Sequence, residues 1–114
     1  MNAHGFLLVN LGTPDSPSVS DVRRYLGEFL MDEYVIDLPY WVRWLLIRGI
    51  ILNVRPKKAA AAYQSIWTKD GSPLYSISRD LTQAIQMHSE APVELAMRYG
   101  NPSIRHGLQQ LKNQ

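Results

Sequence analysis

The segment GFLLVNLGTP, residues 5–14, decides the fold class of this chain. Its first part, residues 5–11, is nearly continuous in apolar side chains, and Gly12-Thr13-Pro14 closes the run. A short strand that is apolar on both faces is typical of a parallel sheet covered by helices on both sides. The segment therefore predicts a buried strand of an α/β protein.

The segment PVELAMRY, residues 92–99, predicts a second strand. Val93, Leu95 and Met97 alternate with Glu94, Ala96 and Arg98, so one face of this strand is clearly apolar. Arg98 is expected to project away from that apolar face, at the carboxyl end of the strand. Ligands of α/β proteins bind at this edge of the sheet.

Helical patterns fill most of the chain between and after these strands. The first helix is expected to begin at a serine cap, Ser18 or Ser20, because a serine oxygen accepts from free backbone N–H groups. Its buried face would hold apolar residues at helical spacing, namely Val22, Tyr25, Leu26, Phe29 and Leu30. Further helices are expected at residues 41–52, 57–67 with Pro56 in the first turn, 74–88, and from about 104 onward.

Together these elements predict an α/β fold, as the N-terminal part of a doubly wound parallel-sheet lobe that is incomplete in this chain. A parallel sheet needs more than two strands, and a strand–helix series that ends on a helix predicts another strand next. The alternative is a small α+β domain that is complete at 114 residues.

Composition and charge narrow the function classes. Hydrophobic residues make up 46% and charged residues 19% of the 114, an ordinary globular composition. The absence of cysteine excludes disulfides and thiolate metal sites. A net charge of only +2 does not indicate nucleic-acid binding.

The charge is unevenly distributed along the chain. Between Asp37 and Asp70 there is no acidic residue, whereas six basic residues lie there: Arg43, Arg48, Arg55, Lys57, Lys58 and Lys69. This region suits an anionic ligand or an anionic membrane surface, and a solvated basic edge is the alternative. The apolar stretch at residues 34–52 is interrupted by charges, so a membrane span is not expected, and a helix lying on a surface stays open as an alternative.

Four segments resemble ferrochelatase, the family that inserts ferrous iron into a porphyrin. They are LLVNLGTP (7–14), VRRYL (22–26), IWT with GSP (66–73) and ELAMRYGNPS (94–103), and they lie in the family's order and spacing. The bacterial, protoporphyrin-using branch is the most similar. The resemblance implies two doubly wound, chelatase-like lobes with a porphyrin cleft between them. Residues 1–114 would form the N-terminal part of the first lobe, with lip helices at about 34–55.

The resemblance also implies which residues line the porphyrin pocket. Leu11 matches an apolar position that faces the macrocycle, with plain core packing as the alternative. Arg55, Tyr63 and Ser72 match positions that hold the propionate edge. An arginine suits a carboxylate because its fork donates two parallel hydrogen bonds. The alternatives are a surface cation, a helix-face aromatic and a turn residue, respectively.

Arg98 and Tyr99 match a pair on the side of the pocket where the metal enters, with a structural salt bridge as the alternative for Arg98.

The family's catalytic histidine, in a histidine–serine motif, and its partner glutamate have no position in this sequence. No metal site or cofactor is therefore expected in this chain, and ferrous iron is a substrate of the full-length enzyme. His4, His88 and His106 lack metal-ligand spacing and are expected to be structural or exposed.

The resemblance implies that the lip meets a membrane through Trp41, Trp44 and Ile47, which would make a cytoplasmic protein peripheral to the membrane. Burial of this helix against the rest of the protein or a dimer partner is the alternative. The leading function is insertion of ferrous iron into protoporphyrin IX to form protohaem, with no role for nucleic acid. A chelatase for coproporphyrin or another tetrapyrrole is the second candidate, and a non-catalytic membrane-associated binding module is the third.

Overall fold

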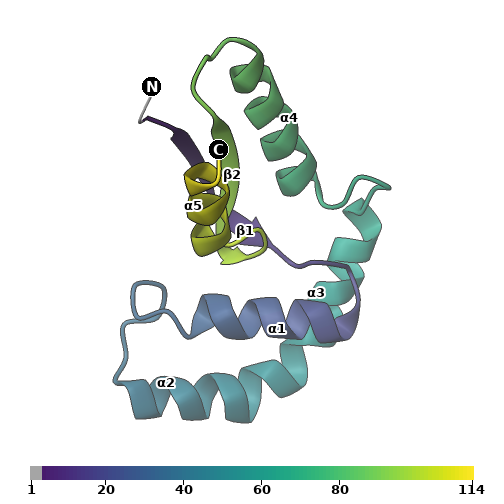
Figure 1. Cartoon of the computed structure of the whole chain (residues 1–114). Coiled ribbons are helices and arrows are strands. Elements are labelled where there is room, and N and C mark those ends of the chain that lie inside the picture. The colour runs from purple at the N-terminus through teal and green to yellow at the C-terminus, as the bar shows by residue number, and fades with distance from the viewer. Residues whose placement is uncertain (1–3) are drawn as a thin grey trace. The chain divides into compact units, whose positions relative to one another are not determined.

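Two parallel strands and two helices form one of the two units into which the computed structural model divides the chain (Figure 1). The structure describes residues 4–114. This first unit, up to Thr13 and from Pro73 to Gln114, contains β1 (Phe6–Thr13), α4 (Pro73–Met87), β2 (Val93–Gly100) and α5 (Ile104–Lys112). Both predicted strands are confirmed.

The sheet of the first unit lies between two helical layers. A Cβ atom on Gly107 of α5 would come within 2.6 Å of Leu7 Cδ1 and 3.2 Å of Ala96 Cβ, so α5 packs closely on that face. On the other face, the Asn10 side-chain amide donates to the Ser78 hydroxyl of α4 at 3.0 Å. These three layers and the parallel pairing confirm an α/β lobe of which the chain carries a part.

The prediction that β1 is buried on both faces is wrong for the described residues. Phe6 is 56% exposed, and Val9 and Leu11 are each 48% exposed. In β2, by contrast, Ala96 and Met97 are fully buried. The physical reason is that the described residues supply two strands only, so β1 has a strand neighbour on one side and incomplete cover.

The second unit, Pro14–Ser72, is helical. It consists of α1 (Val19–Leu30), α2 (Tyr40–Leu46), a π-helical turn η1 (Ile47–Ile51) and α3 (Leu52–Ile66). Helices α1 and α2 run in opposite directions (Figure 1). Ser18 caps α1 because its hydroxyl accepts from the Asp21 N–H at 3.2 Å, which decides between the two predicted serine caps.

The predicted break between the second and third helices is absent. Helical structure continues from Tyr40 through Ile66, and Pro56 lies inside α3 rather than in a first turn. A continuous buried stripe explains this result, because Ile47, Leu52, Pro56 and Ala60 are all buried. The π turn sets Ile47 and Leu52 five residues apart on one face, and burial of the stripe outweighs the roughly 3 kcal/mol that an internal proline costs.

Candidate functional site

The carboxyl ends of β1 and β2 place two predicted pocket residues side by side in the first unit. Asn10 stands opposite Met97 and Gly12 opposite Tyr99, so Leu11 stands opposite Arg98. Partners in a parallel register share a face of the sheet, and both of these side chains are exposed. An apolar group and a cation therefore meet at the edge where α/β proteins bind ligands.

Tyr99, the next residue, has a different environment. Only 5% of Tyr99 is exposed, and strand alternation places it on the face of Leu95 and Met97. The Arg98 guanidinium carbon lies 5.5 Å from the centre of the Tyr99 ring, within the range of a cation–π contact. The structure thus uses Tyr99 to fill the core of the unit and to support Arg98.

Helix α3 carries two more of the predicted pocket residues. Arg55 is exposed, and its guanidinium has no hydrogen-bond or ion-pair partner within residues 4–114. Tyr63 is half-buried and its ring meets that of Trp67 edge-on, with 6.3 Å between the ring centres. Partial burial raises the pKa of the Tyr63 phenol, so it remains a neutral hydrogen-bond donor.

Arg55 and Tyr63 are eight residues apart, about 12 Å along the axis of α3 and about 80° apart around it. Such a spacing suits an extended ligand that carries more than one acidic group. Ser72 follows the turn in which Thr68 and Gly71 exchange backbone hydrogen bonds, and it is only 2% exposed. Three of the six predicted residues thus belong to each unit.

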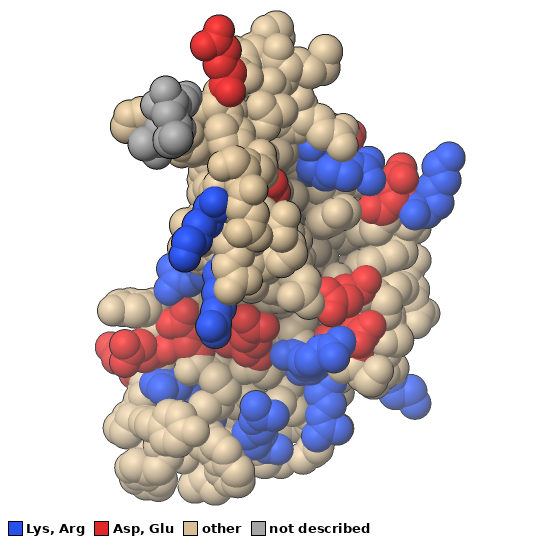
Figure 2. Space-filling model, viewed as in Figure 1, with Lys and Arg blue, Asp and Glu red and all other residues tan. Residues whose placement is uncertain are grey.

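The lip region exposes large apolar side chains, but one predicted member is wrongly assigned. Trp41 is 68% and Trp44 47% exposed, and with Tyr40 and Leu45 they line a hollow of about 360 Å³. Ile47 is completely buried, so it cannot contact a membrane. Figure 2 shows an uncharged region over α2, at the lower left, with Lys and Arg groups beside it.

Arg43 is a residue of the lip whose burial the sequence did not indicate. It is 8% exposed, and its Nη1 donates to the Leu38 carbonyl at 2.7 Å while its Cζ lies 5.6 Å from the Tyr40 ring centre. No protein group in residues 4–114 accepts from its buried Nε. Arg43 therefore ties the segment before α2 to that helix rather than facing solvent.

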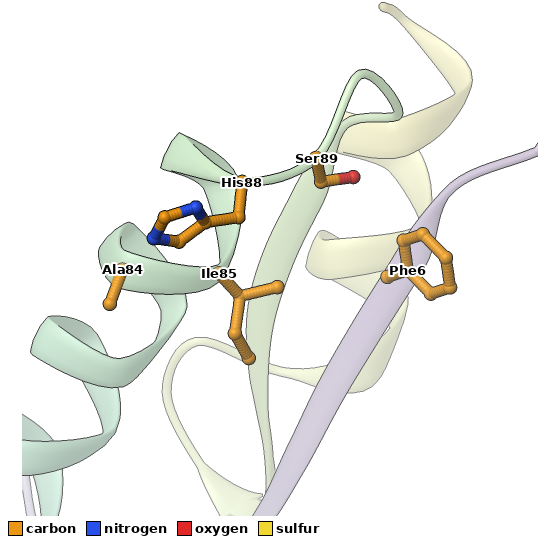
Figure 3. Close-up of a pocket in the computed structure, with 5 residues that line it drawn as sticks. All are labelled: Phe6, Ala84, Ile85, His88 and Ser89. Carbon is orange, nitrogen blue, oxygen red and sulfur yellow. The ribbon is translucent and has the colours of Figure 1, made fainter.

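A second hollow, of about 490 Å³, lies at the opposite end of the strands from Leu11 and Arg98. It is lined by Phe6 of β1 and by residues at the end of α4, namely Ala84, Ile85, His88 and Ser89 (Figure 3). In Figure 3, Ile85 points from α4 toward β1 and the His88 ring lies at the rim. The hollow is mainly apolar, and His88 lies apart from the carboxyl edge of the sheet.

All three histidines are exposed, as expected. In residues 4–114, no group of three or more His, Cys, Asp or Glu side chains is arranged to hold a metal ion. Over the same residues, no helix is long and apolar enough to cross a membrane.

Comparison with known proteins decides the family. The model of the family described as Ferrochelatase matches residues 3–114, which is nearly the entire chain. The chain belongs to the ferrochelatase family. This result confirms the resemblance that the four sequence segments indicate.

Individual ferrochelatases are similar over the same region. The chain is 60% identical over 112 residues to ferrochelatase of Azotobacter vinelandii, an alignment that covers 97% of the chain. It is 56% identical to ferrochelatase of Ectopseudomonas mendocina and 53% identical to that of Stutzerimonas stutzeri, with the whole chain covered in both cases. The chain spans about a third of the length of these curated relatives. No solved structure is significantly similar to it.

Proposed function

We propose that the full-length protein containing this chain is a ferrochelatase, a lyase that inserts ferrous iron into protoporphyrin IX and forms protohaem for haem biosynthesis. The observation that supports this proposal is the family match over residues 3–114, together with similar relatives that are named ferrochelatase. The 114 residues would form the N-terminal part of the first lobe, including its lip helices.

Different pocket residues would bind different parts of the porphyrin, a flat apolar ring with two propionates. Leu11, half-exposed at the end of β1, would face the macrocycle. The Arg55 guanidinium, which has no partner in residues 4–114, would hold the propionate edge by hydrogen bonds together with the neutral Tyr63 phenol and the Ser72 hydroxyl. Arg98, supported by Tyr99, would lie on the side where the metal enters.

Metal insertion requires a bent ring, whose nitrogen lone pairs point out of the plane, and a base for the pyrrole protons. Contacts at the ring periphery can drive this bending, because binding energy from non-reacting parts of a substrate offsets strain at the reacting centre. These residues would contribute binding and bending. The catalytic histidine and glutamate of the family would come from outside the 114 residues, and ferrous iron would be a substrate rather than a resident cofactor.

The lip favours protoporphyrin over coproporphyrin. Coproporphyrin carries more carboxylates and calls for more cations around its pocket, whereas the lip presents the aromatic hollow lined by Tyr40, Trp41, Trp44 and Leu45. An apolar substrate is matched by such a surface because burial of apolar area is favourable.

An anaerobic insertion assay tests the proposed function. The full-length protein, mixed with ferrous iron and protoporphyrin IX, should convert the porphyrin Soret band to that of haem, and should do so faster than with coproporphyrin. The 114-residue chain alone should not exceed the protein-free rate. A faster reaction with coproporphyrin would identify the second candidate, and no reaction with either porphyrin would favour a non-catalytic binding module.

We further propose that the lip contacts a membrane surface, so that the protein is cytoplasmic and peripheral to the membrane. In the lip, Trp41 and Trp44 are exposed with Tyr40 and Leu45, whereas Ile47 is buried and takes no part. Aromatic side chains beside cations are typical of helices that lie in a membrane interface. A substrate delivered from lipid would enter such a lip directly.

Replacing both Trp41 and Trp44 by serine in the full-length protein should weaken its binding to neutral phosphatidylcholine vesicles about tenfold. That loss corresponds to roughly 55 Å² of apolar surface at about 25 cal/mol per Å². Co-sedimentation with vesicles measures it. Replacing the same two residues by leucine retains the apolar surface and should restore most of the binding. Unchanged binding by the serine variant would show that the lip does not enter lipid.

A further inference from the structure

The arginines of the second unit differ in whether a carboxylate neutralises them. Arg24 on α1 contacts the Asp21 carboxylate and lies 3.6 Å from Asp15. Its neighbour Arg23 and Arg48 of the π turn have no acidic partner anywhere in residues 4–114. Two cations of one compact helical unit are therefore available to an external anion.

A single asparagine links these two arginines. The Arg23 Nη2 donates to the Asn53 Oδ1 at 3.3 Å. The Asn53 Nδ2 in turn donates to the Gly49 carbonyl at 3.0 Å and to the Arg48 carbonyl at 3.4 Å. Asn53 thus holds the Arg23 side chain and satisfies carbonyls of the π turn from which Arg48 extends.

The Arg48 guanidinium lies beside a glycine of α1. A Cβ atom on Gly27 would lie 3.8 Å from Arg48 Nη2, 3.9 Å from Arg48 Cζ and 3.3 Å from Leu52 Cδ1. The guanidinium therefore lies against the helix at Gly27. The tight neighbour of Gly27 is the Leu52 side chain, whereas a Cβ atom would meet the arginine at an ordinary van der Waals distance.

Arg23 and Gly27 are four residues apart on α1 and so occupy the same face, where Cβ atoms of such pairs are about 5–6 Å apart. The Arg23 guanidinium contacts Asn53, and the Arg48 guanidinium lies against α1 at Gly27. We propose that Arg23 and Arg48, with Asn53 holding the Arg23 side chain in place, form a binding site, the arginine cradle, for the phosphate group of an anionic phospholipid. The two planar guanidinium forks can donate to several oxygens of one phosphate, while Asn53, whose amide hydrogens are donated to carbonyls, holds Arg23.

Two observations favour a lipid phosphate over a porphyrin propionate as the ligand. Asn53 and Arg55 are two residues apart on α3, which places them about 200° apart around its axis, so the cradle and the proposed propionate group Arg55 lie on opposite sides of the helix. Exposed apolar residues flank Asn53 and Arg48 in the same segment, namely Ile50 and Val54. Cations beside apolar side chains suit an anionic bilayer surface. This inference rests on the proposed membrane contact of the lip.

Vesicle binding by variants of the full-length protein tests the cradle. The double variant Arg23→Gln/Arg48→Gln should lose about 25-fold in affinity for vesicles containing phosphatidylglycerol, about fivefold for each arginine. Its binding to pure phosphatidylcholine should change less than twofold. Lys69→Gln is the matched control, because it removes one charge from the same unit beyond the far end of α3, about 20 Å from Asn53 along that helix. It should lose less than twofold with either vesicle.

Arginine-to-lysine variants separate a built phosphate site from diffuse charge attraction. Arg23→Lys/Arg48→Lys keeps both charges but loses the planar guanidinium groups. Its affinity for phosphatidylglycerol vesicles should therefore be several-fold lower than that of the wild type, although the net charge is the same. Full binding by the lysine variant, or equal losses in Lys69→Gln, would overturn the cradle while leaving the lip intact. A loss of porphyrin affinity in the glutamine variant would place these arginines in the substrate site and also overturn it. The proposed membrane contact of the lip is tested separately, because unchanged vesicle binding by the variant with Trp41 and Trp44 replaced by serine would contradict it.

Discussion

Ile47→Ser in the full-length protein should lower the free energy of unfolding by about 3–5 kcal/mol. Ile47 is completely buried in the second unit, in the stripe that also contains Leu52 and Ala60. Serine would leave a cavity where the larger side chain packed and would bury a hydroxyl, and both changes are destabilising. Thermal unfolding followed by circular dichroism should show a melting temperature lowered by roughly 4–7 °C, because full-length relatives are about three times as long as this chain.

Ile50→Ser is the matched control for this prediction. It makes the same chemical change three residues later in the same π turn, but Ile50 is 59% exposed. Its melting temperature should stay within about 2 °C of the wild type, because exposed substitutions usually cost less than about 0.5 kcal/mol. Similar losses in both variants would mean that the π turn does not separate a buried from an exposed face.

The sequence predicts those elements whose signals are local. The alternation of Val93, Leu95 and Met97 identifies β2, and serine caps mark the starts of α1 and α5, where the Ser103 hydroxyl accepts from the His106 N–H at 3.1 Å. The pairing of Leu11 with Arg98 could also be anticipated, because parallel strands bring their carboxyl ends to the same edge.

The lip shows why periodicity alone fails there. Trp41, Trp44 and Ile47 are spaced by three residues, and in an α-helix each such step turns the side chain by about 60° away from the previous one. Ile47 is therefore about 120° from Trp41, which moves it from the exposed face to the buried face. The π turn then inserts one extra residue, which keeps Leu52 on the buried face and carries the helix through Pro56. No local residue pattern in this segment predicts a π-helical turn.

The sequence also does not predict which basic side chains lie beside a carboxylate. Arg23 and Arg24 are neighbours, yet among the described residues 4–114 carboxylates lie beside Arg24 and not beside Arg23, because consecutive residues point about 100° apart around α1. Arg43 is buried against the Leu38 carbonyl, although its position in an apolar helix suggests a polar side chain that reaches solvent. Gly27, a glycine in the middle of α1, is the local signal that another side chain packs closely there, and the structure shows that this side chain is Leu52.

Arg55→Ala in the full-length protein should weaken porphyrin binding about tenfold to a hundredfold, because a hydrogen bond to a charged group contributes roughly 1.5–3 kcal/mol. The Arg55 guanidinium is exposed on α3 and has no partner in residues 4–114, so nothing in the described structure competes with a propionate for it. Fluorescence quenching during a protoporphyrin titration measures the dissociation constant.

Two further variants show whether Arg55 acts through its fork or only through its charge. Arg55→Lys keeps the charge but cannot form two parallel hydrogen bonds, so its affinity should lie between those of the wild type and Arg55→Ala. Lys58→Ala removes a charge from the exposed surface of the same helix three residues later and should change the affinity less than twofold. Since Arg55 is exposed, its removal should leave the melting temperature nearly unchanged. Equal, small effects of Arg55→Ala and Lys58→Ala would identify Arg55 as an ordinary surface cation and remove it from the propionate site.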